Sequence, residues 1–177
     1  PDTVAQLERL IVELETRRDA LARSIMIDIG SPIDFARDKQ VEAGIAHLRA
    51  TLNAARSMPS EVEIAAGGHD VHYSPVGIAA LITPWNWPLN QVALKLGGAL
   101  AAGCAMILKP SARCPSTAIR LAQLAQEAGL PDGVLQVING DKSVVDAILD
   151  NETVQAVGFV GSTPIAQYIY GRAAANG

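Results

Sequence analysis

The sequence is poor in cysteine, in aromatic residues and in clustered basic residues. Its 177 residues include two cysteines, Cys104 and Cys114, with no CxxC pair and no Cys/His cluster, so we expect no metal site. Lysine and arginine number 14 against 18 acidic residues, giving a net charge of −4 with no basic run. Nucleic acids and acidic membrane surfaces are therefore not expected partners.

Long hydrophobic runs and leader signals are also missing. The longest apolar stretch, 92–108, is interrupted by Lys95 and by glycines, so no membrane span is expected. Pro1 is not expected to be the natural start, because no methionine precedes it. Hydrophobic residues still make up 49% of the chain and charged residues 18%, which favours a packed core over a disordered tail. Lone cysteines without a leader predict reduced thiols and a cytoplasmic location.

Two amphipathic helices are predicted before residue 58. Apolar residues recur at three- and four-residue spacing over 2–27, and only Arg18 interrupts the stripe. A Gly-Ser-Pro turn at 30–32 ends this helix, and Asp34 is expected to cap a second helix whose apolar face begins at Val41. Such stripes also fit a coiled coil, but the short lengths and the turn favour an antiparallel pair packed on a domain.

The pattern then changes to strands. Segments 61–66 and 70–74 flank Gly-Gly-His at 67–69, which predicts a hairpin. Short apolar strands then alternate four times with helices. The expected strands are 77–82, 105–108, 134–138 and 156–160, and the expected helices are 89–102, 115–128, 141–149 and 163–175. Because each strand is apolar throughout, helices should cover both faces of an open, mostly parallel, doubly wound α/β sheet. In such sheets ligands bind beyond the carboxyl ends of the strands.

The loop 83–88 contains a carboxamide, Asn86, between Trp85 and Trp87. A rigidly held amide can donate a hydrogen bond to a developing oxyanion. The alternative is a turn asparagine that caps the following helix between two packing tryptophans, and the residues alone favour that alternative.

Two further loops carry candidate binding groups. Lys109 at a strand end, followed by Ser111, suits an anionic or polyhydroxy ligand, although a lysine extending to solvent from a strand end is about as good an interpretation. Gly161 and Ser162 precede a helix whose N-terminus can bind a phosphate. The alternative is an ordinary Ser/Thr cap followed by proline. A GxGxxG fingerprint is absent, so the dinucleotide signal from motifs alone is weak.

Four motifs resemble the aldehyde dehydrogenase superfamily. They are Ile-Thr-Pro-Trp-Asn at 82–86, Leu-Lys-Pro-Ser at 108–111, Glu-Ala-Gly-Leu-Pro-Asp-Gly-Val at 127–134, and Phe-Val-Gly-Ser-Thr at 159–163. The resemblance implies N-terminal helices over 1–58 packed on a coenzyme domain, an oligomerisation hairpin over 59–75, and a Rossmann-like coenzyme-binding domain over 76–177. It also implies a homo-oligomer.

The resemblance assigns roles to the loop residues. Asn86 would stabilise the oxyanion, and Lys109 would hydrogen-bond the adenosine ribose. The coenzyme-binding set is Ile82, Thr83, Pro84, Trp85, Lys109, Ser111, Ala112, Phe159, Gly161, Ser162 and Ile165. The implied reaction oxidises a small-molecule aldehyde to an acid through a cysteine thiohemiacetal, with NAD or NADP as coenzyme.

Departures from the family leave several points open. Ala112 stands where NAD-preferring members usually have Glu, and Arg113 follows it, so NADP or both coenzymes are plausible. The nucleophilic cysteine of the family lies downstream of Gly177, and neither Cys104 nor Cys114 matches it. The stretch is therefore expected to be inactive alone, and a nucleotide-binding or assembly module is a second interpretation. A helical interaction protein is a third, which the four strand–helix units oppose.

The acyl acceptor is also open. Segments 139–142 and 161–170 resemble the CoA-acylating methylmalonate-semialdehyde dehydrogenases, whereas 83–91 and the N-terminal helices resemble bacterial enzymes that release a free acid. Oxidation of the thiohemiacetal would leave an acyl group on the cysteine as a thioester. That acyl group would pass to water or, alternatively, to CoA. Because the two resemblances differ along the chain, three origins stay open: a natural fragment, a natural mosaic of two enzymes, or an assembled sequence.

Overall fold

The protein folds around one four-stranded parallel sheet. The computed structural model describes residues 2–58, 61–64 and 69–176. The strands are β3 (Ile78–Ile82), β4 (Ala105–Lys109), β5 (Leu135–Val137) and β6 (Val154–Phe159). Their order is β5-β4-β3-β6, and every neighbouring pair is parallel. The open α/β sheet that the sequence predicts is confirmed, and strand limits differ from the expected ones by one or two residues.

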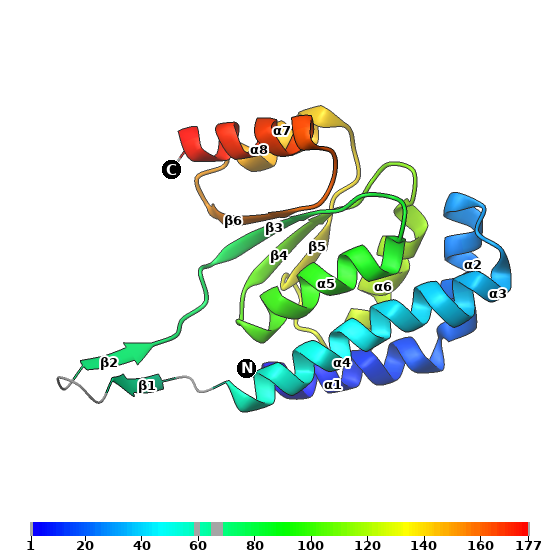
Figure 1. Ribbon diagram of the computed structural model, residues 1–177, viewed down its shortest axis with the longest axis horizontal. Helices are drawn as coiled ribbons and strands as arrows, with labels where there is room; N and C mark the ends of the chain where they lie inside the picture. Colours follow the sequence, from blue (N-terminus) through cyan, green and yellow to red (C-terminus); the bar gives the residue numbers. More distant parts are fainter. Residues whose placement is uncertain (1, 59–60, 65–68, 177) are drawn as a thin grey trace.

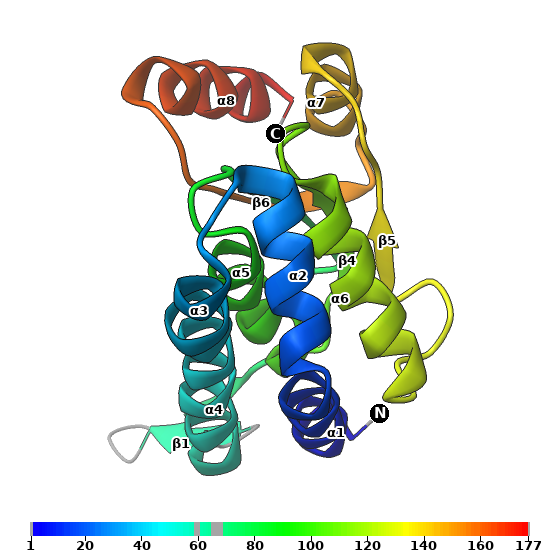
Figure 2. The same cartoon turned by 90° about the vertical axis from the view of Figure 1, so that its right-hand side faces the viewer.

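Helices cover both faces of this sheet. They are α5 (Pro88–Ala101), α6 (Pro115–Glu127), α7 (Lys142–Leu149) and α8 (Thr163–Ala175). Figures 1 and 2 show α5 and α6 on one face and α7 and α8 on the other. The chain moves outward from β3 to β4 to β5 and then crosses back to β6 beside β3. The direction of winding therefore reverses between β3 and β6, and such a reversal is where open α/β sheets bind ligands.

The first predicted helix is two helices. The structure has α1 (Thr3–Thr16) and α2 (Arg18–Ile29), separated at Arg17 with φ −100° and ψ 19°. The single helix expected over 2–27 is therefore wrong. The break turns the chain so that α1 packs beside α4 while α2 packs mainly on α6 and η1 (Figure 2). The apolar stripe in the sequence does not reveal this break, because the apolar faces of α1 and α2 are both buried.

The second predicted helix starts earlier than expected and contains a wide turn. It comprises α3 (Ile33–Phe35), a π-helical segment η1 (Ala36–Val41) and α4 (Glu42–Ser57). Pro32 holds the cap position without a side-chain bond, so the cap expected at Asp34 is wrong. Asp34 lies in the first turn and pairs with Arg37 at 2.8 Å.

The N-terminal helices form the antiparallel pair that the sequence predicts. Ion pairs join α1 and the start of α2 to α4, with partner numbers that run in opposite directions: Glu8–Arg56, Glu15–Arg49 and Arg18–Glu42. Glycines then let α4 approach α5. A Cβ at Gly97 would lie 3.1 Å from Leu48 Cδ2, and one at Gly44 would lie 3.0 Å from Leu89 Cγ.

A separate antiparallel hairpin precedes the sheet. Strands β1 (Glu61–Ile64) and β2 (His69–His72) pair with Glu61 opposite His72 and Ile64 opposite His69. The predicted Gly-Gly turn at 67–68 lies outside the described residues. Figure 1 shows the two strands at the end of a long extension, apart from the main sheet.

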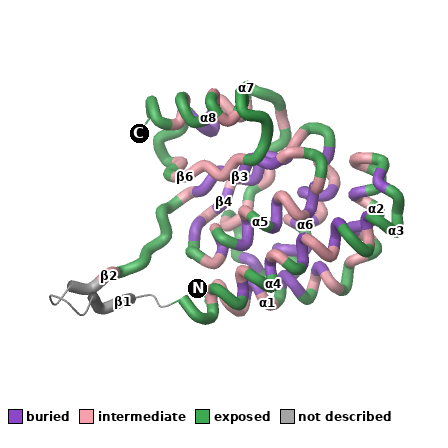
Figure 3. Tube along the Cα trace, in the orientation of Figure 1, coloured by how far each residue is buried: buried purple, intermediate pink, exposed green. Residues whose placement is uncertain are grey.

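The core lies mainly on the α5/α6 side of the sheet. One large cluster joins α1, α2 and α4 through α5 and α6 to the strand residues Ala79, Leu81, Met106 and Leu108. A small cluster on the other face has Ile82, Leu149 and Ile169 as its buried members. Figure 3 shows this difference, with buried segments concentrated below the sheet and mostly exposed ones in α7 and α8.

Candidate functional site

Three of the predicted loops start from one row across the sheet. Ile82 lies opposite Lys109 on one side and Phe159 on the other, and the Thr83 N–H donates to the Lys109 carbonyl at 3.2 Å. Residues opposite each other in a parallel pair point to the same face. The side chains of Ile82, Lys109 and Phe159 therefore share the face that α7 and α8 cover.

The Asn86 carboxamide is exposed and forms no hydrogen bond with any described residue. Its alternative role as the cap of α5 is wrong, because Trp87 holds that cap position and no side chain caps the helix. Trp87 packs against Phe35, edge to face, with ring centroids 5.8 Å apart. Trp85 stays 46% exposed, so only one of the two rings is a packing residue.

Lys109 is buried, with 8% of the residue exposed. No described side chain forms a hydrogen bond or an ion pair with its ammonium group. Burial lowers the pKa of Lys109, and the charge of Asp141 opposes that shift. Little of this lysine is therefore exposed, and its side chain starts on the face of the sheet that α7 and α8 cover.

The loop after β4 is tied to the loop after β3. The Ser111 hydroxyl accepts the Arg113 N–H at 3.3 Å, which closes a tight turn. The Arg113 guanidinium lies 5.7 Å from the centre of the Trp85 ring. Ala112, between them, is exposed. The loop thus places a guanidinium beside Trp85, and its residues 111–113 include no carboxylate.

The loop after β6 brings Gly161 against an aromatic ring. A Cβ at this position would lie 2.3 Å from Phe159 Cζ, so the absent side chain makes room for Phe159. Ser162 holds the cap position of α8 but caps nothing with its side chain, which makes the ordinary serine cap wrong. Ser162 and Ile165 are exposed, so the first turn of α8 is open to a ligand.

The four helices that follow sheet strands differ at their N-termini. Asp28 of α2 accepts the Thr117 N–H of α6 at 2.8 Å, and Asp141 accepts the Ser143 N–H of α7 at 2.9 Å. No described side chain caps α5 or α8. The two uncapped helices are those that follow β3 and β6, on either side of the winding reversal. Both helices start just beyond the carboxyl ends of neighbouring strands, and an uncapped N-terminus of this kind favours an anion.

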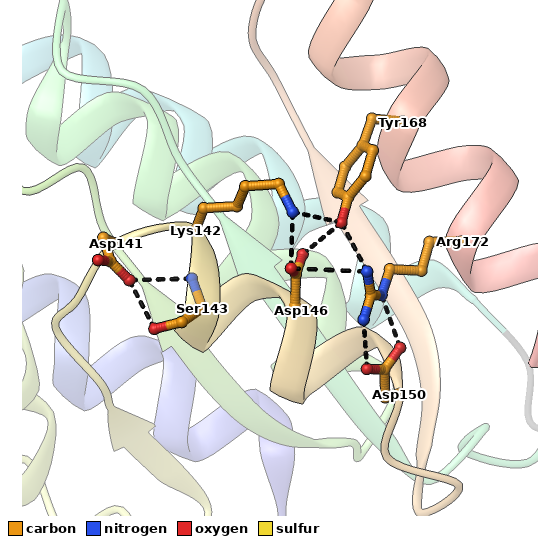
Figure 4. Close-up of polar contacts among 7 residues, drawn as sticks. All are labelled: Asp141, Lys142, Ser143, Asp146, Asp150, Tyr168 and Arg172. Carbon is orange, nitrogen blue, oxygen red and sulfur yellow. Dashed lines mark hydrogen bonds and ion pairs between the residues drawn. The ribbon is translucent and has the colours of Figure 1, made fainter.

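A polar network joins α7 to α8, and sequence reasoning missed it. In Figure 4 the Tyr168 hydroxyl lies between Asp146 and Lys142, at 2.6 Å from each. Arg172 contacts Tyr168 at 2.7 Å and pairs with Asp150. The hydrogen bond from Lys142 lowers the pKa of Asp146, and the one from Arg172 lowers the pKa of Asp150. The four-residue spacing of 142, 146 and 150 on one helix and of 168 and 172 on the next is the signal that could have revealed it.

The cysteines are free and buried. Burial raises the pKa of the Cys114 thiol to about 11, so its thiolate is scarce at neutral pH and the side chain is a poor nucleophile. Among residues 2–58, 61–64 and 69–176, no group of three His, Cys, Asp or Glu side chains is arranged to hold a metal ion. No helix in the same ranges is long and apolar enough to span a bilayer.

Comparisons with known proteins agree with this geometry. The model of the aldehyde dehydrogenase family matches residues 2–177. Malonate-semialdehyde dehydrogenase 2 of Bacillus mycoides is 43% identical over 162 residues, which cover 90% of this chain and 33% of that protein. An aldehyde dehydrogenase of Bartonella henselae superposes with a TM-score of 0.95 at 35% identity, covering 99% of this chain and 37% of that one.

A third relative was crystallised with ligands. Aldehyde dehydrogenase C of Pseudomonas syringae, in complex with NAD+ and octanal, superposes with a TM-score of 0.94 at 32% identity. The match covers 98% of this chain and 36% of that enzyme. The chain thus spans about a third of the length of the relatives it matches.

Proposed function

Because this chain belongs to the aldehyde dehydrogenase family, we propose that it forms the coenzyme-binding part of an enzyme that oxidises an aldehyde to an acid. The observation that carries the proposal is the row Lys109–Ile82–Phe159, with uncapped helices on both sides of the winding reversal. A dinucleotide needs donors for its pyrophosphate and a partner for its ribose hydroxyls.

The residues present fit such a ligand. The first turn of α8, with Ser162 at its start, would hold the pyrophosphate, and Lys109 would bind the adenosine ribose. Burial lowers the pKa of Lys109 and so disfavours its charged form, and hydrogen bonds from ligand hydroxyls would offset that penalty. The nicotinamide, when bound, supplies the hydride acceptor. Asn86 would donate its free amide to the oxygen of the reacting carbonyl, which lowers the energy of the negative charge developing there.

We propose that neither cysteine of this chain is the family's thiol nucleophile, because both are buried and burial raises the pKa of Cys114 to about 11. Its thiohemiacetal chemistry therefore belongs to the parent enzyme, and a nucleotide-binding or assembly module remains the second candidate for the stretch alone. Assaying the 177-residue chain for aldehyde-dependent coenzyme reduction tests the module interpretation. Measurable turnover would defeat the module interpretation.

The coenzyme test is direct binding. We expect the chain to bind NAD+ with a saturable isotherm in titration calorimetry. Lys109→Met is expected to weaken binding about 10- to 100-fold, because a charged hydrogen bond contributes roughly 1.5–3 kcal/mol. Lys39→Met, which removes an exposed lysine of η1, serves as the matched control and should leave the affinity unchanged. A folded chain that binds neither NAD+ nor NADP+ contradicts the proposal.

The choice between coenzymes rests on the loop after β4. Its residues Ser111, Ala112 and Arg113 include no carboxylate that would repel a 2′-phosphate, and Arg113 supplies a cation. We therefore propose that the chain accepts NADP as well as NAD. Dissociation constants for the two coenzymes decide this, and tight NAD+ binding with negligible NADP+ binding rules it out.

The acyl acceptor and the assembly are proposed at the level of the parent enzyme. The identity to a malonate-semialdehyde dehydrogenase favours keeping CoA beside water as the acceptor, and product analysis with and without CoA distinguishes them.

The hairpin over 59–75 is proposed as the oligomerisation arm on the N-terminal helices and coenzyme domain. Light scattering on the chain with and without 59–75 tests this, and an unchanged mass would contradict it.

A further inference from the structure

Helix α6 is capped by a residue from another helix. Its own cap residue, Cys114, forms no capping bond, and Pro115 in the first position has no N–H. The next two N–H groups, of Ser116 and Thr117, donate to Asp28 at 3.2 and 2.8 Å, and the Thr117 hydroxyl donates to the same carboxylate at 2.7 Å. These are the N–H groups that a local cap side chain would satisfy.

Asp28 is unfavourably placed for the helix that carries it. It lies in the last turn of α2, which has no basic residue there, and a carboxylate at that position faces the negative end of the helix dipole. At the start of α6 the same carboxylate faces the positive end of a dipole. The stabilisation it provides is therefore tertiary, between residues 88 and 89 positions apart.

The remote cap leaves residue 114 free for another contact. A serine or aspartate there would turn back onto α6, whereas Cys114 is 2% exposed and its sulfur lies 3.9 Å from the Pro84 carbonyl oxygen. One residue earlier, Arg113 lies over the Trp85 ring. Both contacts join the loop after β4 to the loop after β3, at the two residues that precede Asn86.

We propose that Asp28 is a positioning residue for the coenzyme site. By fixing the first turn of α6, its carboxylate holds the Ser111–Cys114 loop against Pro84 and Trp85. The N-terminal helices thus set the shape of the adenosine side of the cleft as well as packing on the sheet. The part of this inference that concerns coenzyme rests on the function proposed above.

The first experiment measures binding. We expect Asp28→Ala to raise the dissociation constants for NAD+ and AMP about fivefold, since losing a cap costs roughly 1 kcal/mol, and to leave that for nicotinamide mononucleotide unchanged. Asp28→Asn keeps one acceptor and should recover part of the affinity. The matched control is Asp2→Ala, which removes the cap of α1 and should lower stability without changing any of the three constants. Equal losses for AMP and nicotinamide mononucleotide would overturn the proposal.

The second experiment needs no ligand. Alkylation by iodoacetamide, read by peptide mass spectrometry, reports the exposure of Cys114 against Cys104, which is buried where β4 begins. We expect Asp28→Ala to speed labelling of Cys114 about tenfold and to leave Cys104 unchanged. Equal acceleration of both thiols would show general destabilisation and refute the positioning role. If the wild type binds no coenzyme, the proposed function fails, while the labelling result still decides whether Asp28 holds the loop.

Discussion

Lys109 at the end of β4 is mostly buried, and its charge should couple folding to pH. Burial lowers its pKa below the ordinary lysine value. Between the folded and unfolded pKa values the unfolded chain binds more protons, so this residue's contribution to stability rises as pH rises through that window. The charged form is correspondingly unfavourable at neutral pH, unless a ligand hydrogen-bonds to it.

We therefore expect Lys109→Met to be more stable than wild type at neutral pH and to lose that advantage in the alkaline range. Urea unfolding at a series of pH values measures the difference. Lys95 also has a lowered pKa because of burial, but it is present in both proteins and cancels in the comparison. A difference in unfolding free energy that is constant with pH would contradict the assignment.

Gly161 offers a second test at the scale of one residue. An alanine Cβ would fall 2.3 Å from the Phe159 ring, so the ring must move and the loop before α8 with it. We expect Gly161→Ala to weaken coenzyme binding measurably. Gly171→Ala is the control, because a Cβ there meets nothing within 4 Å, and alanine in a helix should stabilise it by about 0.5–1 kcal/mol. Unchanged affinity in the first variant would show that the ring position does not shape the site.

Single residues were predictable from sequence when their role is local or shared with a family. The motifs placed Lys109, Asn86 and Ser162 at strand ends, and the structure brings their loops to one edge of the sheet. Asp28 could not be found this way, because its partners are 88 and 89 residues away. Its only local signal was an acidic residue at the wrong end of a helix.

At the scale of elements, one hydroxyl lies at the centre of the polar contact between α7 and α8. The Tyr168 hydroxyl contacts Lys142, Asp146 and Arg172, while Tyr170, two residues on, is 78% exposed. We expect Tyr168→Phe to accelerate amide exchange in α7 and α8, because it leaves Asp146 and Arg172 without a shared partner. Tyr170→Phe should change nothing. Hydrogen exchange read by mass spectrometry compares the two, and identical profiles would mean that apolar contacts alone hold the pair.

Elements were predictable where a local pattern decides them. The four strands are short apolar runs, and glycine or proline marks the ends of most of the helices between them. The structure reproduces these elements closely. The break at Arg17 and the π-helical turn at 36–41 were missed. Both follow from where α1, α2 and α4 must lie to cover α5 and α6. An amphipathic pattern predicts which side of a helix is buried, but it does not predict which element packs against that side.

At the scale of the whole molecule, the two faces of the sheet are unequal. The α5/α6 face joins the N-terminal helices in one continuous core, whereas the α7/α8 face has Ile82, Leu149 and Ile169 as its buried members. Regions with few buried apolar contacts open at lower free energy than the global transition. The layer that would bind the coenzyme is therefore the one that opens first, which suits a site that must admit and release a ligand.

This inequality predicts how two core truncations will differ. Ile169→Ala removes apolar volume from the small cluster and should cost about 2–5 kcal/mol locally, accelerating amide exchange in α7 and α8 while β4 and α5 stay protected. Leu96 is fully buried in the large cluster, so Leu96→Ala should lower the global free energy and accelerate exchange throughout the chain. NAD+ should slow exchange in α8 in wild type, because a ligand that binds only the closed layer stabilises it by mass action. Exchange in α7 and α8 as slow as in α5 would show that the sheet and both layers unfold as one unit.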